Sequence, residues 1–479
     1  MTSRRLALVA VVLAGFVALF VVGRERPTAA IAEFADPPRW STPIVPPGEL
    51  VTSTWYCPGV PAVGDSGSGE EGGEVIVANP SDVELTGRIT VLTPDQAPVV
   101  EQLTVAAREQ TVVDLDEVVT AVFAAAVVEL DGGVGIVEQR AIHPSGASVA
   151  PCANSASSTW YFADGFTAEG STERLVLTNP FPAPTIVDIG FVTAEGPRAP
   201  TSFQGYVVPA RSVRVISLAE AGARDEPVLA VKVEATSGQL VAAKSQHFVG
   251  GGRIGFVNAL GAPSLDDQWW FADGGKGEGI TEQYMVYNPT EETVEVDLVV
   301  LGVVPVEGII DDTTLTVPAG EVVAFDTASI AGVPDGAHGV VVSTLASDSI
   351  VVERVLTQPA GDGVATTVVL GAQTAALSGR WHAVTSTELA IEDVIVVLNT
   401  SFSEGVVVVK AIGPGGEVPV PGLEEIPLPA NGIVSIDLTS PLAFGRSLVV
   451  ESQLPVIVER RLERDPNLRG RSGSLAIPE

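Results

Sequence analysis

The chain repeats itself, and the clearest sign of this is one phrase that occurs twice. Residues 160–180 read WYFADGFTAEGSTERLVLTNP, and residues 269–289 read WWFADGGKGEGITEQYMVYNP, 109 positions later and without a gap. An active site is rarely duplicated in tandem, whereas a structural unit often is. The phrase therefore predicts a series of similar domains, and the length of 479 residues exceeds what one hydrophobic core usually organises.

Two weaker copies follow the same outline. Trp55-Tyr56 leads to Asn79-Pro80, and Trp381-His382 leads to Asn399-Thr400. We expect each Trp to cap one end of a core, each Asn to close a turn through its side-chain amide, and the Pro to end the strand. The structural residues that mark the four repeats are Trp55, Trp160, Trp269 and Trp381, together with Asn79, Asn179, Asn288 and Asn399.

Each repeat shows about seven short, Val-rich strand patterns in roughly 105 residues, with turn signals between them. The pattern predicts an all-β fold of four tandem Ig-like β-sandwiches after one N-terminal transmembrane helix or signal anchor. One helical turn is expected within residues 114–130. A β-propeller is the alternative, but propeller blades need a period nearer 40–50 residues, and half of this repeat holds no second Trp or Asn-Pro. The predicted boundaries are 1–26 for the cytoplasmic tip and anchor, 27–50 for a linker, and 51–153, 154–263, 264–376 and 377–479 for the repeats.

The N-terminal sequence suggests that the repeats lie outside the cytoplasm. Arg4 and Arg5 precede an uncharged run at residues 6–22, which lies at the lower limit for crossing a bilayer. The positive charges before the run favour an N-terminus inside and repeats outside, as a single-pass plasma-membrane protein. Secretion after cleavage behind Ala32 is the alternative, although the charged residues 24–26 disfavour it.

The two cysteines, Cys57 and Cys152, both fall in the first repeat. Outside the cytoplasm such a pair tends to oxidise, so we expect a disulfide that ties the first and last strands of that repeat. The chain-entropy model assigns a ring of this size a stabilisation of about 4 kcal/mol. Two inert buried thiols are the alternative.

Composition and motifs argue against several classes of activity. The formal net charge of −33 repels a phosphate backbone, so no nucleic-acid partner is expected. The protease-like stretch at residues 64–67 has no histidine before His143 to activate its serine. The glycine-rich residues 250–255 are followed by a strand where a dinucleotide site needs a helix. His143 and His247 occupy equivalent places and are expected to pack. We predict no enzyme and no cofactor.

Repeated acidic residues leave one metal hypothesis open. Carboxylates beside a flexible glycine-rich loop suit Ca²⁺, although a solvated acidic turn is the simpler alternative. The candidates, which match position for position in repeats two and three, are Asp164, Glu169, Glu173, Asp273, Glu278 and Glu282. A second acidic set shares one strand position, Glu138, Glu353-Arg354 and Glu459-Arg460, and predicts a repeated ion pair that fixes strand register.

The W-[YW]-F-A-D-G…N-P phrase, the V-P-A turn and the V-E-R strand together resemble the actinobacterial domain of unknown function 5719 family. The resemblance covers nearly the whole chain after the apolar run and implies an actinobacterial protein of the cell envelope. Repeat four departs from it, with Trp381-His382-Ala383 in place of the aromatic-Asp-Gly phrase.

The expected function is that of a non-enzymatic, membrane-tethered rod of end-to-end sandwiches, acting as an extracytoplasmic scaffold or adhesion module. Its expected partners are the membrane, through the N-terminal helix, and a cell-wall polysaccharide or an envelope protein. The alternative is a carbohydrate-binding protein, which requires an exposed aromatic pair beside a polar groove. An enzyme of unknown class is a remote alternative.

Overall fold

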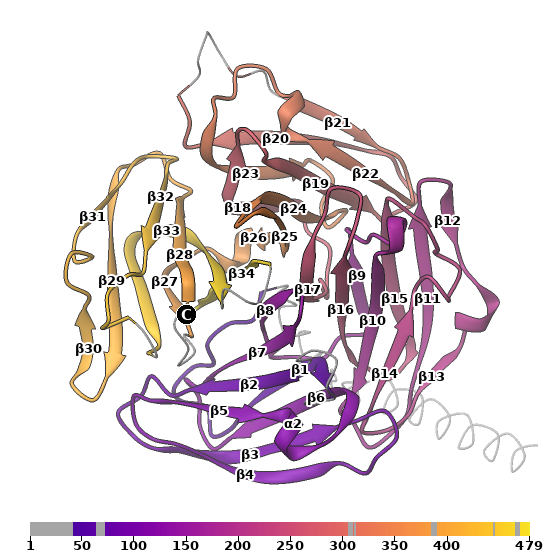
Figure 1. The fold of residues 1–479 in the computed structure, drawn as a ribbon, viewed down its shortest axis with the longest axis horizontal. Helices are drawn as coiled ribbons and strands as arrows, with labels where there is room; N and C mark the ends of the chain where they lie inside the picture. The colour runs from indigo at the N-terminus through magenta and orange to yellow at the C-terminus, as the bar shows by residue number, and fades with distance from the viewer. Residues whose placement is uncertain are drawn as a thin grey trace, which may run out of the picture. The chain divides into compact units, whose positions relative to one another are not determined.

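The computed structural model describes residues 42–63, 72–304, 310, 313–384, 390–443, 446–464 and 470–479, all within one compact unit, Trp40–Glu479 (Figure 1). The predicted anchor at residues 6–22, the cleavage site behind Ala32 and the protease-like stretch at residues 64–67 lie outside the described residues. None of the helices in the described part has the length and apolar composition to span a bilayer.

The described fold is almost entirely β, and repeats 1 to 3 each contain two antiparallel sheets, as predicted for a sandwich, while the strands of repeat 4 are joined into one sheet through β33. In repeat 1 the sheets have the strand orders β1-β6-β3-β4 and β5-β2-β7-β8. The strands are β1 (Ser53–Ala62), β2 (Gly72–Ala78), β3 (Leu85–Leu92), β4 (Val99–Val105), β5 (Gln110–Asp114), β6 (Ala121–Leu130), β7 (Ile136–His143) and β8 (Gly146–Pro151). The predicted helical turn is α2 (Leu115–Val118), capped by the Asp114 carboxylate, which accepts from the Asp116 amide.

Repeats 2 and 3 follow the same plan. Repeat 2 contains β9 (Thr159–Phe162), β10 (Thr172–Asn179), β11 (Thr185–Thr193), β12 (Gly196–Arg198), β13 (Tyr206–Val208), β14 (Ser212–Ser217), β15 (Leu229–Ser237), β16 (Val241–Phe248) and β17 (Gly255–Leu260). Repeat 3 contains β18 (Gln268–Lys276), β19 (Thr281–Asn288), β20 (Val294–Leu301), β21 (Thr313–Val317), β22 (Glu321–Asp326), β23 (Gly336–Thr344), β24 (Val351–Ala360), β25 (Gly363–Leu370) and β26 (Ala372–Gln373).

Repeat 4 contains β27 (Ser378–Ala383), β28 (Ala390–Asn399), β29 (Gly405–Gly413), β30 (Gly416–Pro419), β31 (Ile426–Leu428), β32 (Ile433–Asp437), β33 (Leu448–Arg464), β34 (Ser472–Leu475) and β35 (Ile477–Pro478). Here one long strand pairs with different strands along its length. Residues 448–451 of β33 pair with β27, and residues 456–464 pair with β28.

The two sheets of a repeat are interleaved along the chain. In repeat 1 the chain enters the first sheet with β1, crosses to the second with β2, and returns to the first with β3. Half a repeat is therefore not a folding unit, which explains why the sequence shows no period shorter than about 105 residues.

Each opening tryptophan lies in the core of its own repeat. Trp55, Trp160, Trp269 and Trp381 are at most 1% exposed and belong to four different apolar clusters. In repeats 2 to 4 the indole N–H also donates to a strand carbonyl, for example from Trp160 to Leu240 O at 2.9 Å. The predicted core role is confirmed by the burial of all four indole rings.

The four asparagines close their turns as predicted. Asn288 Oδ1 accepts from the backbone N–H of Thr290 at 3.0 Å, and its Nδ2 donates to the Glu292 and Val317 carbonyls at 2.8 and 3.1 Å. The same contact to the residue two positions later occurs at 2.9–3.0 Å for Asn79, Asn179 and Asn399. One side chain thus joins the end of a strand to the neighbouring turn, which accounts for the recurrence of the asparagine.

The repeats do not stand apart from one another. Their closing strands β8, β17, β25 and β34 contact in cyclic order, and Figure 1 shows them converging. Asn258 N donates to Ser148 Oγ at 2.9 Å, Thr366 N donates to Ile254 O at 2.8 Å, and Val149 N donates to Ser472 Oγ at 2.8 Å. The expectation of a rod of independent repeats is wrong for this unit, because the last repeat returns to the first.

Apolar packing also continues from one repeat to the next. Phe123 and Val127 of repeat 1 share a cluster with Val176 and Val213 of repeat 2. Tyr161 and neighbouring side chains of repeat 2 join the core cluster of repeat 3. Sheets of adjacent repeats therefore pack on one another, as the blades of a propeller do, although repeats 1 to 3 are each two-sheet sandwiches.

The end of the segment predicted as a linker is packed against the repeats. Thr42 and Val45 are buried, at 3% and 6% exposure. Ile44 N donates to Asn154 Oδ1 at 2.6 Å, and Val45 N donates to Pro478 O at 2.8 Å. Residues 42–46 therefore join the last repeat to the start of the second repeat, instead of forming a free spacer.

Candidate functional site

The glutamates of the V-E-R strands form ion pairs across the repeat boundaries. Glu353 of repeat 3 lies 2.9 Å from Lys244 Nζ of repeat 2, and Glu459 of repeat 4 lies 2.7 Å from Arg354 of repeat 3. All four side chains are at most 2% exposed. The predicted ion pair exists. It joins neighbouring repeats, whereas we expected it to fix the strand register within one repeat.

The aromatic-Asp-Gly phrase supplies the other half of each junction. The backbone N–H groups of Ala163 and Asp164 donate to Glu353 Oε2 at 2.7 and 2.6 Å. In the next junction Ala272 N donates to Glu459 Oε1 at 2.6 Å. The phrase therefore recurs because its backbone binds the carboxylate of the following repeat, a role that we did not predict.

The aspartate of the phrase pairs with an arginine. Asp164 Oδ1 lies 3.0 Å from Arg253 Nη1, and Asp273 Oδ1 lies 2.5 Å from Arg461 Nη1. Burial raises the pKa of Asp273 to about 6, although Arg461 favours the charged form. The two aspartates thus complete a buried network of opposite charges at each of these junctions.

The basic member of the junction stays charged. Burial alone would lower the pKa of Lys244, but the carboxylates of Glu353 and Asp164 outweigh burial and raise this pKa. Burial raises the pKa of the neighbouring Glu173 to about 8, so this carboxyl group is protonated at neutral pH. Because Glu173 is neutral, it adds no further negative charge beside the carboxylates of Glu353 and Asp164.

The remaining two junctions differ from each other. In repeat 4, Arg460 binds Asp393 at 2.8 Å, and Glu138 of repeat 1 contributes to the raised pKa of Arg460. Between repeats 1 and 2 the equivalent positions hold Gln139 and Ala243, as the strand registers show. At these positions the junction of repeats 4 and 1 therefore brings Arg460 near Glu138, and the junction of repeats 1 and 2 carries no charged side chain.

Of the six residues proposed as calcium ligands, five contact other groups of the protein or lie in the buried junctions, and the sixth is exposed. Glu282 Oε2 contacts His338 Nε2 at 2.7 Å and Thr327 Oγ1 at 2.9 Å, while Glu169 Oε2 accepts from Gly251 N at 2.6 Å. Asp164, Glu173 and Asp273 belong to the buried junctions, and Glu278 is exposed. Among the residues that the structure describes, no three His, Cys, Asp or Glu groups are placed to hold a metal ion.

The predicted disulfide between Cys57 and Cys152 is present, with a Cα–Cα distance of 4.4 Å. Both residues are buried, at 1% and 0% exposure. The bond ties β1 to the segment that follows β8, across a sequence separation of 95 residues. It stabilises the repeat whose junction to the next repeat has Gln139 and Ala243 at the positions of the buried ion pair.

His143 and His247 pack together at the same junction, as their equivalent positions suggested. Their ring centroids lie 4.5 Å apart, and His143 stacks on Phe256 at 4.4 Å. Burial lowers the pKa of His143 to about 4, so its ring is neutral at neutral pH. Ser145 Oγ lies 2.8 Å from His247 Nε2, beside a cavity of about 320 Å³. A hydroxyl next to an imidazole is a contact that a hydrolase would use.

A larger cavity, of about 380 Å³, opens where repeat 2 meets the outer face of the β1-β6-β3-β4 sheet. We call it the Tyr56 groove. Tyr56 and Phe181 line it as half-buried rings 6.3 Å apart. Arg88, which binds Glu129 through two hydrogen bonds of 2.6 and 2.8 Å, and Arg211 also line it. Aromatic faces beside a few polar groups are typical of small-ligand sites.

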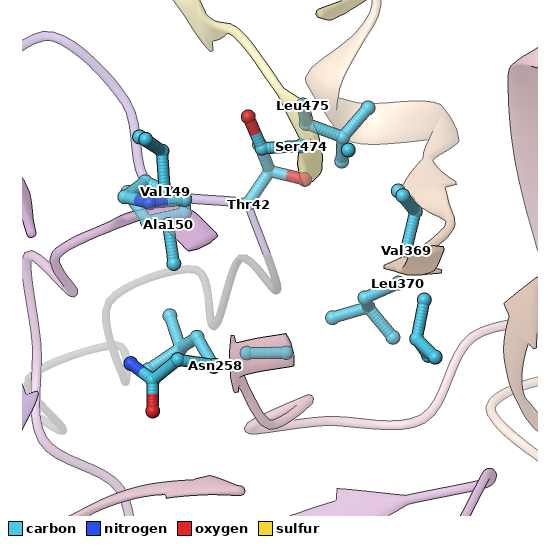
Figure 2. A pocket seen from close by; sticks show the side chains of 14 residues that line it. Thr42, Val149, Ala150, Asn258, Val369, Leu370, Ser474 and Leu475 are labelled. Atoms are coloured by element: carbon cyan, nitrogen blue, oxygen red, sulfur yellow. The ribbon is translucent and has the colours of Figure 1, made fainter. Parts of the chain in front are cut away.

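The closing strands of all four repeats surround a central pocket (Figure 2). Figure 2 shows Val149, Val369, Leu370 and Leu475 around it, with Asn258 among the few polar side chains. Its volume is about 50 Å³, enough for only a few water molecules. The centre of the unit is therefore a packed, mostly apolar contact between repeats.

Comparisons with known proteins place the chain in a family. No curated protein matches it. A solved structure, described as "Crystal Structure of Thermotoga maritima 1070", matches with 11% identity and a TM-score of 0.20, over 23% of this chain and 95% of that chain. The sequence model described as "Family of unknown function (DUF5719)" matches residues 137–265 and 261–466. These regions make up more than half of the sequence, and the chain belongs to the DUF5719 family of unknown function.

Proposed function

We propose that this protein is a non-enzymatic interaction module of the cell envelope, tethered to the plasma membrane by its N-terminal apolar run and lying outside it. The observation that carries the proposal is the disulfide between Cys57 and Cys152. Disulfides persist in oxidising compartments and are rare in the cytosol. The uncharged run at residues 6–22, preceded by two arginines, supports the same address.

The use of the charged residues supports a non-enzymatic role. Lys244, Glu353, Arg354 and Glu459 neutralise one another inside the repeat junctions, where they are at most 2% exposed. Catalytic groups with shifted pKa values usually face a cleft that admits a substrate. Here the buried charges stabilise the contacts between repeats and leave the surface grooves for recognition.

The compartment can be tested on the protein from intact cells. Thiols are blocked with an alkylating reagent at the moment of lysis, and the mass of the chain is compared before and after reduction. We expect both cysteines to resist the reagent until reduction, and an impermeant amine-reactive label to reach the repeats on unbroken cells. Free thiols at lysis, together with repeats protected from the label, would contradict the proposal. The N-terminal residue of the mature chain separates an anchor from cleavage behind Ala32.

The absence of catalysis can be tested at Ser145. A fluorophosphonate probe reacts with serines that a neighbouring base activates. We expect no labelling of the native protein above the level of a Ser145→Ala variant. Labelling that disappears in this variant would overturn the non-enzymatic proposal and would favour a hydrolase.

Carbohydrate binding is a second candidate, and one observation favours it. The Tyr56 groove places two half-buried aromatic rings beside charged and hydroxyl-bearing side chains. The opening tryptophans do not contribute, because they are buried in the repeat cores.

A further inference from the structure

Repeat 2 departs from the other repeats at one turn position, two residues after the asparagine that closes the turn. Repeats 1, 3 and 4 carry a hydroxyl there, and it donates to the asparagine Oδ1. The distances are 2.7 Å for Ser81, 2.6 Å for Thr290 and 2.9 Å for Ser401. Repeat 2 carries Phe181 and lacks this hydrogen bond. The turn therefore gives up a stabilising contact of about 1 kcal/mol to hold an aromatic ring.

Phe181 is not used to fill a core. Its ring is half-buried and lines the Tyr56 groove, 6.3 Å from Tyr56. Val100 of β4 lines the same groove and is 55% exposed. Exposed apolar side chains that gather in a concave site mark a surface that a ligand covers.

A second departure meets the first in the same groove. Arg211 occupies a turn position with φ of 51°, where repeats 3 and 4 carry Gly320 and Asn431, the residue types that adopt this conformation most readily. Repeat 1 also has an arginine there, Arg108, which reaches Pro414 O of repeat 4 at 3.4 Å. In the part of the chain that the structure describes, the guanidinium of Arg211 has no such partner, and it lines the groove.

The charges of the groove indicate the sign of its ligand. Arg88 and Glu129 neutralise each other through two hydrogen bonds, so Arg211 leaves one positive charge in excess. This local positive charge favours an anionic group over a neutral one, and it acts against the net charge of −33 that the whole chain carries. The Thr54 and Thr90 side chains also line the groove and offer hydroxyl groups.

The corresponding place at the next junction is closed. Tyr161, the equivalent of Tyr56, is only 9% exposed and packs in the core cluster of repeat 3 with Val294 and Tyr287. The open groove between repeats 1 and 2 is therefore not repeated between repeats 2 and 3. It is not a general consequence of how the repeats pack.

We propose that the Tyr56 groove binds a saccharide that carries an anionic group, either a uronate carboxylate or a sugar phosphate. The apolar faces of the sugar rings contact Phe181 and Tyr56, the hydroxyl groups bind the Arg88–Glu129 pair, and the anionic group binds Arg211. This inference rests on the proposed envelope function and names the class of partner, an acidic polysaccharide.

The test uses the purified full-length chain in detergent and isothermal titration with three probes: trigalacturonate, glucose 1-phosphate and the neutral maltotriose. We expect saturable binding of at least one anionic probe at one site, and affinity for maltotriose at least tenfold weaker. The two anionic probes distinguish a carboxylate ligand from a phosphate ligand. Failure of both anionic probes to bind, or equal affinity for maltotriose, would overturn the proposal.

Two variants borrow residues from other repeats, so they are expected to fold. Phe181→Ser, the residue of repeats 1 and 4, should weaken anionic binding about tenfold or more. Arg211→Asn, the residue of repeat 4, should remove the preference for anionic over neutral probes. Phe402→Ser is the matched control, because Phe402 is 90% exposed in the repeat 4 turn, and it should bind like the native chain. Native affinity in Phe181→Ser would refute the groove as the site. Because this experiment uses purified protein, a negative result would refute the groove as a saccharide site without affecting the compartment test of the proposed envelope location.

Discussion

Replacing Glu353 by glutamine would leave Lys244 as a buried cation without its main counter-charge. The two side chains are each 1% exposed and lie 2.9 Å apart, across the boundary of repeats 2 and 3. Removing one partner of a buried ion pair costs about 3–5 kcal/mol, because the remaining charge is desolvated and uncompensated. Glutamine keeps an acceptor for the Ala163 and Asp164 N–H groups, so the lower end, about 3 kcal/mol, is the expected loss.

The loss can be measured by urea denaturation, followed by the fluorescence of tryptophans such as Trp160 and Trp269, which lie in the cores of repeats 2 and 3. A matched control is Glu234→Gln, which removes the carboxylate of an exposed pair with Lys232. Exposed pairs contribute about 0–1 kcal/mol, so this variant should unfold close to the native midpoint.

A second substitution separates the buried charge from local damage. Adding Lys244→Met to Glu353→Gln removes the uncompensated cation, so the double variant should be more stable than Glu353→Gln alone. A loss below about 1 kcal/mol in the single variant, or no recovery in the double variant, would refute the claim that the ion pair holds these repeats together.

Three further predictions concern other buried residues. Burial raises the pKa of Glu173 to about 8, so the folded chain keeps a proton that the unfolded chain releases near the ordinary pKa of 4.5. The free energy of unfolding should therefore fall as the pH rises from about 5 to about 8. Glu173→Gln should remove this part of the pH dependence in thermal melts. Cys57→Ser with Cys152→Ser should lower the stability by about 2–5 kcal/mol in denaturant titrations, and added reductant should then have no further effect. Asn288→Ala should cost about 2–4 kcal/mol, because the Thr290 amide, the Glu292 carbonyl and the buried Val317 carbonyl lose their partner, and circular dichroism melts would detect the shift.

Much of the secondary structure could be predicted from local signals. The Val-rich alternation, the small-residue turns and the position of Asn288 indicated strands and turn closure, because these depend on residues close together in the chain. The return of repeat 4 to repeat 1 could not be predicted in this way. It depends on contacts such as Val149 N to Ser472 Oγ, between short segments that look like ordinary closing strands.

The Tyr56 groove was also invisible to the repeat pattern. The sequence offered the aromatic pairs that open each repeat as sugar-binding surfaces, but their first members are core residues such as Trp55. The groove instead depends on Phe181 and Arg211, which break the pattern of their turns. Departures from a repeat are therefore a better guide to a binding site here than the repeated residues themselves.

The role of the aromatic-Asp-Gly phrase could have been found by asking which changes occur together. Repeat 1 has Cys57, Pro58 and Gly59 where the phrase belongs, and repeat 2 has Ala243 where the partner glutamate belongs. At this junction the two halves are thus lost together, one in each of two consecutive repeats, whereas at the junction of repeats 4 and 1 the phrase is replaced and Glu138 remains. This is expected if the phrase of one repeat binds the carboxylate of the next, since a buried carboxylate without its donors, or donors without their carboxylate, would each be costly. A staple internal to each repeat would instead have lost both halves within the same repeat.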